Sequence, residues 1–138
     1  MALQRTYKKP LPEITHQSRP FWQACNQHNL LVQQCGNCDR YHLPPAELSP
    51  CCSAPLRWVR ASGRGQVHTF TILHVAYNPA FKDDLPYNVS IIELEEGPLL
   101  LSNVVNCANA ELHIGMPVRV VFENVTPEQA LPRFEPDR

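Results

Sequence analysis

The chain has 138 residues, 43% of them hydrophobic, and a formal net charge of −1. A chain of this length forms one domain, or one domain with a small appendage, around a single modest core. The balanced charge disfavours a non-specific nucleic-acid binder, which needs an excess of positive charge. The apolar runs are too short to span a membrane, and the polar N-terminus does not resemble a signal peptide. We therefore expect a cytoplasmic protein whose six cysteines stay reduced, which favours a metal over disulfides.

The first 29 residues predict an extended arm followed by one short helix. Residues 1–17 are polar and interrupted by prolines, which is typical of an arm without regular structure. The segment 18–29 carries apolar residues at helical spacing. Ser18 can cap this helix, Pro20 suits its first turn, and Asn29 can take the left-handed conformation that ends it.

Two short strands are predicted on either side of a cysteine knuckle. They cover residues 30–34 and 40–43, and the knuckle between them contains Cys35 and Cys38. Zinc ribbons hold a tetrahedral ion with four cysteines on two such knuckles, each with the spacing Cys-x2-Cys. We therefore expect residues 18–55 to form the helix and a small zinc ribbon.

The second half of this metal site is irregular. An adjacent pair, Cys51 and Cys52, stands in a motif that looks like Cys-Pro-x-Cys with Ser49 in place of its first cysteine. The leading interpretation is a structural zinc ion, with His42 as a conceivable substitute ligand. The expected ligands are Cys35, Cys38, Cys51 and Cys52. The alternative is a degenerate ribbon that has lost its metal, in which the thiols serve only in packing.

From Leu56 onward the sequence changes to short β-branched and aromatic runs separated by turn signals. The last run is expected at a sheet edge, because an edge strand tolerates proline. A short helix, 109–115, precedes the fourth long strand, an order that suits the five-stranded oligonucleotide/oligosaccharide-binding (OB) barrel. We therefore expect a mainly β protein in which residues 56–138 form an OB-fold barrel. The predicted strands are 66–77, 87–96, 99–105, 116–125 and 131–136.

The remaining reactive side chains do not form a recognisable catalytic set. His68 and His74 lie six residues apart on one predicted strand and share a face there. Half-exposed positions on a strand explain these histidines better than a pair of catalytic general bases does. The sequence has no nucleophile motif and no phosphate-binding glycine loop. Cys25 and Cys107 are isolated, and we expect them to be buried small hydrophobic residues.

Several segments together resemble a known bacterial and archaeal family. "FWQACNQHNLLVQQCGNCDRYHLPP" is similar to the N-terminal helix and rubredoxin-like ribbon of a family long described as an acyl-CoA-associated domain of unknown function. "LRWVRASGRGQVHTFTILH", "LPYNVSIIELEEGPLLLSNVV", "IGMPVRVVFE" and "LPRFEP" match the barrel of that family in order. The resemblance covers residues 18–136, and its one departure is the second knuckle.

The resemblance implies a role beside a larger enzyme. Members of the family are small partners of thiolase-like enzymes, including sterol-carrier-protein-type thiolases and aldolases, or are joined to enoyl-CoA hydratases. By resemblance, this chain is a non-catalytic or co-catalytic accessory subunit acting on acyl-CoA, in lipid or steroid side-chain metabolism. It would form a hetero-oligomer with that enzyme and would not be an enzyme on its own.

Aromatic side chains are the candidate contacts with the partner or with the acyl channel. They are Phe21, Trp22, Tyr77, Phe81 and Tyr87. The competing function is a nucleic-acid-binding module, since ribbons and OB-folds are common in such proteins. That function needs clustered basic residues with stacking aromatics, whereas Arg119 is the single basic residue between residues 83 and 132.

Overall fold

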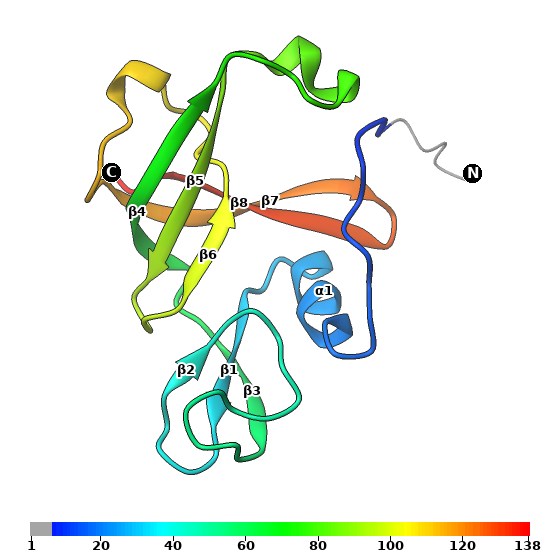
Figure 1. The fold of residues 1–138 in the computed structure, drawn as a ribbon, viewed down its shortest axis with the longest axis vertical. Helices are drawn as coiled ribbons and strands as arrows, with labels where there is room; N and C mark the ends of the chain where they lie inside the picture. Colours follow the sequence, from blue (N-terminus) through cyan, green and yellow to red (C-terminus); the bar gives the residue numbers. More distant parts are fainter. Residues whose placement is uncertain (1–6) are drawn as a thin grey trace.

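The structure is a computed structural model that describes residues 7–138. Two antiparallel sheets lie one above the other in Figure 1, with a single α-helix, α1 (Arg19–Asn26), beside their junction. The smaller sheet has the order β2-β1-β3 and the larger one the order β6-β5-β4-β7-β8. This arrangement confirms the prediction of a mainly β protein with a helix, a small ribbon and a five-stranded OB-fold barrel.

The ends of α1 differ from the expected ones at both caps. Ser18 has the backbone angles φ −91° and ψ −7° and its side chain does not cap the helix. Its Oγ instead accepts the Thr15 amide at 2.9 Å, because a capping side chain needs the extended backbone that Ser18 lacks. At the other end the left-handed residue is His28, with φ 62°, one position before the predicted Asn29. The Asn29 amide then donates to the Ala24 carbonyl at 2.9 Å, which closes a Schellman cap.

The ribbon sheet consists of β1 (Leu31–Cys35), β2 (Tyr41–His42) and β3 (Leu56–Arg60). β1 lies in the middle and pairs antiparallel with both neighbours. The buried Gln33 fixes the loop that follows β2, since its amide exchanges two hydrogen bonds with the backbone of Ala46, at 2.8 and 3.0 Å. β3 begins at the expected boundary of the barrel, residue 56, yet it pairs along its whole length with β1.

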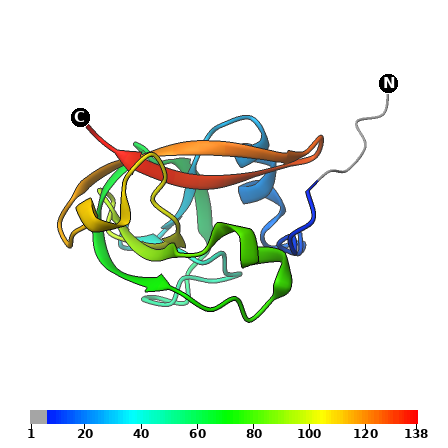
Figure 2. The ribbon, with the colours of Figure 1, turned by 90° about the horizontal axis from the view of Figure 1, so that it is seen from above.

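The barrel is built from five strands that meet in a twisted, nearly closed sheet. The β7–β8 hairpin passes across the top of the barrel in Figure 2. A parallel bridge between Val104 and Phe134 joins the two ends of the sheet. The Val105 amide donates to the Phe134 carbonyl at 2.7 Å across this closure. The strands are β4 (Arg64–Leu73), β5 (Tyr87–Leu94), β6 (Leu99–Ser102), β7 (Pro117–Thr126) and β8 (Gln129–Pro136).

Several predicted barrel elements have different lengths in the structure, and the largest differences are in β4, β6 and the predicted helix 109–115. β4 ends at Leu73 rather than at residue 77, and β6 ends at Ser102 rather than at residue 105. The predicted helix 109–115 is only a 3-10 turn, η2 (Asn109–Glu111). Its extension is prevented by hydrogen bonds to β4, because the Gly115 amide donates to the Val67 carbonyl at 2.8 Å. A second 3-10 turn, η1 (Pro79–Asp84), lies in the loop between β4 and β5.

One hydrophobic core joins the ribbon, α1 and the barrel. It contains Phe21 and Cys25 from α1, Val32 from β1, and barrel residues that include Ile92 and the fully buried Phe134. The helix faces β8 on one side and β1 on the other, so it connects the two sheets. The position of the ribbon relative to the barrel is therefore set by apolar packing.

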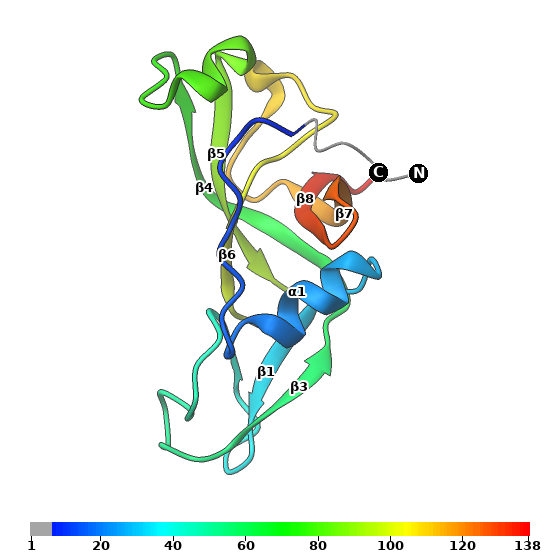
Figure 3. The ribbon, with the colours of Figure 1, turned by 90° about the vertical axis from the view of Figure 1, so that its right-hand side faces the viewer.

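The arm before α1 has no helix or strand within residues 7–14 and runs along the barrel (Figure 3). The Lys9 ammonium forms an ion pair with Asp84 of η1 at 2.5 Å. Nearer to α1, the Gln129 side-chain amide donates to the Pro12 carbonyl at 3.3 Å. Within residues 7–138, no helix has the length and hydropathy needed to cross a bilayer.

Candidate metal centre and contact surfaces

The first cysteine knuckle connects β1 to β2. The Cys35 amide donates to the Arg40 carbonyl at 2.8 Å, and the Asp39 amide donates back to the Cys35 carbonyl at 3.1 Å. Asp39 has a positive φ of 65°, which tightens the turn. The Asn37 amide donates to the Cys35 sulfur at 3.4 Å. Such amide donors stabilise a thiolate, the form that binds a metal.

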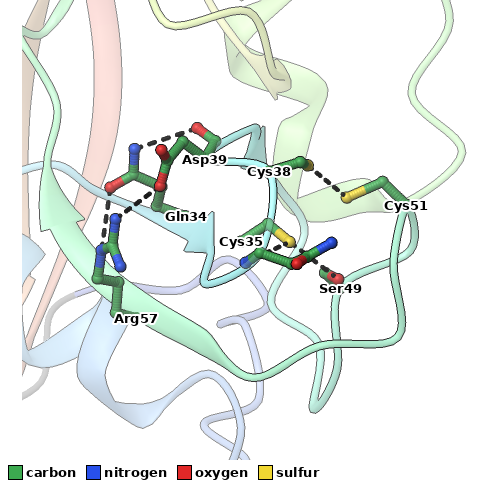
Figure 4. Close-up of polar contacts among 8 residues, drawn as sticks. Gln34, Cys35, Cys38, Asp39, Ser49, Cys51 and Arg57 are labelled. Carbon is green, nitrogen blue, oxygen red and sulfur yellow. Dashed lines mark hydrogen bonds and ion pairs between the residues drawn. The ribbon is translucent and has the colours of Figure 1, made fainter.

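The four predicted ligands come together at the tip of the ribbon. The Sγ atoms of Cys35, Cys38, Cys51 and Cys52 all lie within 4.8 Å of one another. Those of Cys38 and Cys51 are 3.3 Å apart (Figure 4). A zinc–sulfur bond of about 2.3 Å places the sulfurs of a tetrahedral site about 3.8 Å apart. The cluster therefore has the size and the soft donor set that zinc prefers.

Ser49, the residue in place of a regular cysteine, is buried beside this cluster and is 2% exposed. Its Oγ lies 3.3 Å from the Cys35 sulfur (Figure 4). The Ser49 hydroxyl, with smaller effects from the Cys38 and Asn37 amides, lowers the pKa of the Cys35 thiol to about 6. This environment therefore favours the thiolate form of Cys35, the form that binds a metal.

The pKa of the Cys51 thiol is shifted in the opposite direction, upward. The residue is exposed, but its sulfur lies within the cluster, where desolvation and then the contact with Cys38 raise the pKa of its thiol to about 12. The Nε2 atom of His42, on β2, lies 3.2 Å from this sulfur. His42 contacts Cys51 only from outside the four-sulfur cluster, since that cluster does not include its ring nitrogens.

The other cysteines and the paired histidines do not extend the site. Cys25 is fully buried in the core, and burial raises the pKa of its thiol to about 12. Cys107 is half-buried, so it is less enclosed than predicted. His68 occupies a β-bulge in β4, and His74 follows the end of that strand. The prediction that these two histidines share a strand face is therefore wrong, because the bulge and the early strand end interrupt the alternation.

Two of the candidate contact residues line an apolar groove. The groove has a volume of about 660 Å³ and lies between the arm, α1, the loop after β2, and strands β6 and β8. Phe21 is only 5% exposed and contributes to its floor, while Trp22 is half-buried. Their rings meet edge to face, with centroids 5.0 Å apart. Leu101 of β6 also lines the groove and is 67% exposed.

The other candidate aromatics lie near η1. The rings of Phe81 and Tyr87 are 5.8 Å apart, and the Lys9 ammonium lies 5.7 Å from the Phe81 ring centre. Both rings line a smaller pocket of about 250 Å³. Tyr77 is separate from this pair and is 89% exposed. The structure therefore divides the five aromatics into a groove pair, a loop pair and one exposed tyrosine.

Sequence reasoning missed two features of these sites. It treated Ser49 only as a lost ligand, whereas the hydroxyl is buried beside the cluster and contacts the Cys35 sulfur at 3.3 Å. It also did not find the groove, which combines residues from five separate segments. The sequence signal for the groove is the run Leu99–Leu101, an unusually apolar stretch in which Leu99 and Leu101 are exposed.

Comparison with known proteins identifies two family domains in this chain. Residues 22–53 match the rubredoxin-like zinc ribbon domain of ChsH2, and residues 58–123 match its C-terminal OB-fold domain. The chain of a solved structure described as "Ltp2-ChsH2(DUF35) aldolase" is 35% identical and has a TM-score of 0.82. That alignment covers 91% of this chain and 98% of the other.

Curated proteins give the same result. A probable enoyl-CoA hydratase alpha subunit of Thermomonospora curvata is 35% identical over 93% of this chain, and a 3-oxo-4,17-pregnadiene-20-carboxyl-CoA hydratase alpha subunit of Mycobacterium tuberculosis is 30% identical over 91%. This chain spans only 40% of the length of each. A DUF35 domain-containing scaffold protein of Methanocaldococcus jannaschii is 33% identical over 75% of both chains. The chain therefore belongs to the ChsH2/DUF35 family, in which a rubredoxin-like zinc ribbon precedes a C-terminal OB-fold.

Proposed function

We propose that this chain is an accessory subunit that docks on an acyl-CoA-processing enzyme of the thiolase-like aldolase or enoyl-CoA hydratase type. The observation that carries this proposal is the likeness to the "Ltp2-ChsH2(DUF35) aldolase" chain over nearly the full length of both proteins. The names of the hydratase alpha subunits support acyl-CoA as the substrate class, and one of them points to a steroid side chain.

The arrangement of side chains supports an accessory rather than an independent role. A catalytic site needs a nucleophile or base held within hydrogen-bond reach of its partner. Within residues 7–138, the side-chain hydrogen bonds do not include the ring of His68 or His74. We therefore expect the isolated chain to leave acyl-CoA thioesters unchanged.

The four-cysteine cluster would hold a structural zinc ion in this subunit. Its four sulfurs fill a tetrahedral shell and leave no position for substrate, unlike a catalytic zinc, which keeps one position open. The ion would join the two loops at the tip of the ribbon. In this way it would fix the loop after β2 that forms one wall of the groove.

The alternative of a nucleic-acid-binding module is less well supported. The arginines of strands β4, β7 and β8 lie near acidic side chains, as in the Arg119–Glu135 pair at 2.8 Å and the Arg133–Glu123 pair at 3.6 Å. Such pairs cancel the positive charge that would attract phosphates. An OB-fold alone does not decide between functions, because this fold serves many of them.

Co-purification with a thiolase-like aldolase partner tests the proposal. Wild-type chain should co-elute with the enzyme in size-exclusion chromatography. Trp22→Ala should weaken the complex by at least about tenfold, because truncating an interface tryptophan commonly removes about 2 kcal/mol. Tyr77→Ala tests the exposed tyrosine as a separate contact without disturbing the packing, since this side chain is 89% exposed.

Ile114→Ala provides the matched control. Ile114 is 66% exposed and follows η2, at the far end of the barrel from α1 (Figure 1), so its loss should leave complex formation unchanged. Circular dichroism and thermal melts show whether Trp22→Ala has unfolded α1 instead. The proposal is wrong if the isolated chain turns over an acyl-CoA, or if neither a thiolase-like aldolase nor a hydratase partner binds it.

A further inference from the structure

The two halves of the metal centre have the same backbone turn. In the first knuckle, the Cys35 amide donates to the carbonyl of Arg40, five residues on, and the Cys35 carbonyl accepts the amide of Asp39. In the second knuckle, the Ser49 amide donates to the carbonyl of Ala54, also five residues on, at 2.8 Å. The Ser49 carbonyl accepts the Ser53 amide at 2.8 Å. Ser53 has a positive φ of 52°, as Asp39 has one of 65°. The turns are therefore equivalent at an offset of 14 residues.

This equivalence assigns each residue of the second knuckle a place in the first. Ser49 corresponds to Cys35, and Cys52 corresponds to Cys38. Cys51 corresponds to Asn37, which is not a ligand position in a regular knuckle. Yet the Cys51 sulfur lies in the four-sulfur cluster, within 4.8 Å of the other three sulfurs.

The Ser49 hydroxyl uses its whole hydrogen-bonding capacity at this position. It accepts the amides of Cys52 and Ala54, at 3.2 and 3.0 Å. A hydroxyl has two lone pairs and one proton, so the Ser49 proton is free to be donated to the sulfur of Cys35, 3.3 Å away, when Cys35 is a thiolate. Ser49 thus receives the amides of its own knuckle and donates across the site to a ligand of the other.

Because Ser49 takes these amides, they are not directed at Cys51. The Cys51 sulfur lies 3.3 Å from the Cys38 sulfur and 3.2 Å from the Nε2 atom of His42, and the Ser49 hydroxyl also acts on its thiol. With its proton on Nε2, the neutral imidazole donates to a thiolate at that distance. Donors of this kind offset the charge of bound thiolates and hold them in place.

We propose that metal ligation in the second knuckle has moved from position 49 to Cys51, with Ser49 retained as a hydrogen-bonding support and His42 as the donor that positions the new ligand. This inference rests on the zinc ion of the proposed function. It assigns Cys35, Cys38, Cys51 and Cys52 to the metal, and it gives Ser49 and His42 positioning roles outside the coordination shell.

Cobalt(II) substitution in the purified, reduced full-length chain tests the shift of the ligand. The thiolate-to-cobalt charge-transfer band, measured per bound ion, counts thiolate ligands. Cys51→Ser should lower this band by about a quarter, because one of four thiolates is lost. In a Ser49→Cys background the same Cys51→Ser change should leave the band at its wild-type intensity, because the regular ligand position is filled again.

His42→Ala and Ser49→Ala test the two positioning roles. Both should keep the full charge-transfer band but weaken zinc binding, measured by competition with a chromophoric chelator, by about 10- to 100-fold. His42→Gln should recover part of the affinity, since its amide can still donate to Cys51. A band reduced or shifted by His42→Ala would instead make His42 a ligand and overturn its assignment.

The outcomes separate this inference from the proposed zinc ion itself. If the wild-type chain binds neither zinc nor cobalt, the structural zinc ion of the proposed function is wrong. If the wild-type chain binds one ion but Cys51→Ser keeps the full band, the ligand shift is wrong and the zinc ion stands. A folded double variant, verified by circular dichroism, that fails to regain the band also overturns the inference.

Discussion

Cys25 shows how a buried thiol links stability to pH. It lies on α1 in the shared core, with no exposed surface, and burial raises the pKa of its thiol from 9.0 to about 12. The unfolded chain therefore releases this proton near pH 9, while the folded chain keeps it until about pH 12. Below pH 9 the thiol is neutral in both states, so its contribution to stability is fully present there and is lost as the pH rises through this window.

We predict that the free energy of unfolding of the wild type falls more steeply above pH 9 than that of Cys25→Ala. The difference in slope should approach about 1.4 kcal/mol per pH unit, the value for one linked proton. Urea melts of both proteins between pH 7 and pH 10.5, in reducing buffer, measure it. Every other titrating group is common to both proteins, so parallel curves would contradict the assignment.

At the scale of secondary structure, Asn88 joins β5 to the segment that follows β6. Its side-chain Nδ2 donates to the Val104 carbonyl at 2.8 Å, and its Oδ1 accepts both the Val104 amide and the Ser90 hydroxyl at 2.8 Å. The side chain is buried. It therefore replaces strand pairing beyond Ser102 and brings residues 103–105 to the barrel closure at Phe134.

Asn88→Ala should lower the free energy of unfolding by about 3 kcal/mol or more. The change leaves Val104 and Ser90 with buried polar groups that have lost their partners, each worth about 1–3 kcal/mol. Asn26→Ala is the matched control, since this exposed helical residue donates its side-chain amide to the Pro127 carbonyl at 3.3 Å, and its effect should stay within about 0.5 kcal/mol. Equal effects of the two changes in urea denaturation would show that the Asn88 network does not carry the closure.

The elements that could be predicted from the sequence are those determined by local pattern. β-branched and aromatic runs located the barrel strands, and the Cys35–Cys38 spacing located the first knuckle. The errors have tertiary causes. Val67 receives the amide of Gly115 and so shortens the predicted helix 109–115, and the bulge at His68 depends on the partner strand β5.

The metal site was predictable only in part for the same reason. Four cysteines in a short segment indicate a metal site without any knowledge of the fold. The hydrogen bond between Ser49 and Cys35 joins residues 14 positions apart, on two different loops. The sequence places Ser49 at the first-cysteine position of the second knuckle, but only the folded backbone shows that its hydroxyl contacts Cys35.

At the scale of the whole molecule, the ribbon tip and the barrel should respond differently to metal removal. The loop from Leu43 to Pro55 has little regular structure, with one isolated bridge between Leu48 and Pro55. The barrel has its own continuous sheet and most of the core. Structural zinc contributes on the order of 10 kcal/mol to the folding of small zinc modules, so the tip would depend on the proposed zinc ion far more than the barrel does.

We predict that zinc removal by a chelator, under reducing conditions, speeds amide hydrogen exchange in residues 36–55 and leaves β5 to β8 close to their original rates. Hydrogen-exchange mass spectrometry of the zinc-loaded and chelated chain measures this pattern, and Cys38→Ser should reproduce it without chelator. A uniform increase over the whole chain would mean that ribbon and barrel unfold as one cooperative unit.

The equivalence of the two knuckles also has an evolutionary consequence. Their shared turn is made by backbone hydrogen bonds, so it tolerates either serine or cysteine at position 49. A chain with cysteine at both 49 and 51 has five thiols around an ion that needs four, so either one can be lost without emptying the site. The ligand can therefore migrate along the loop by single substitutions, each passing through a functional protein, and a search that requires the regular cysteine spacing will miss descendants that have kept their metal.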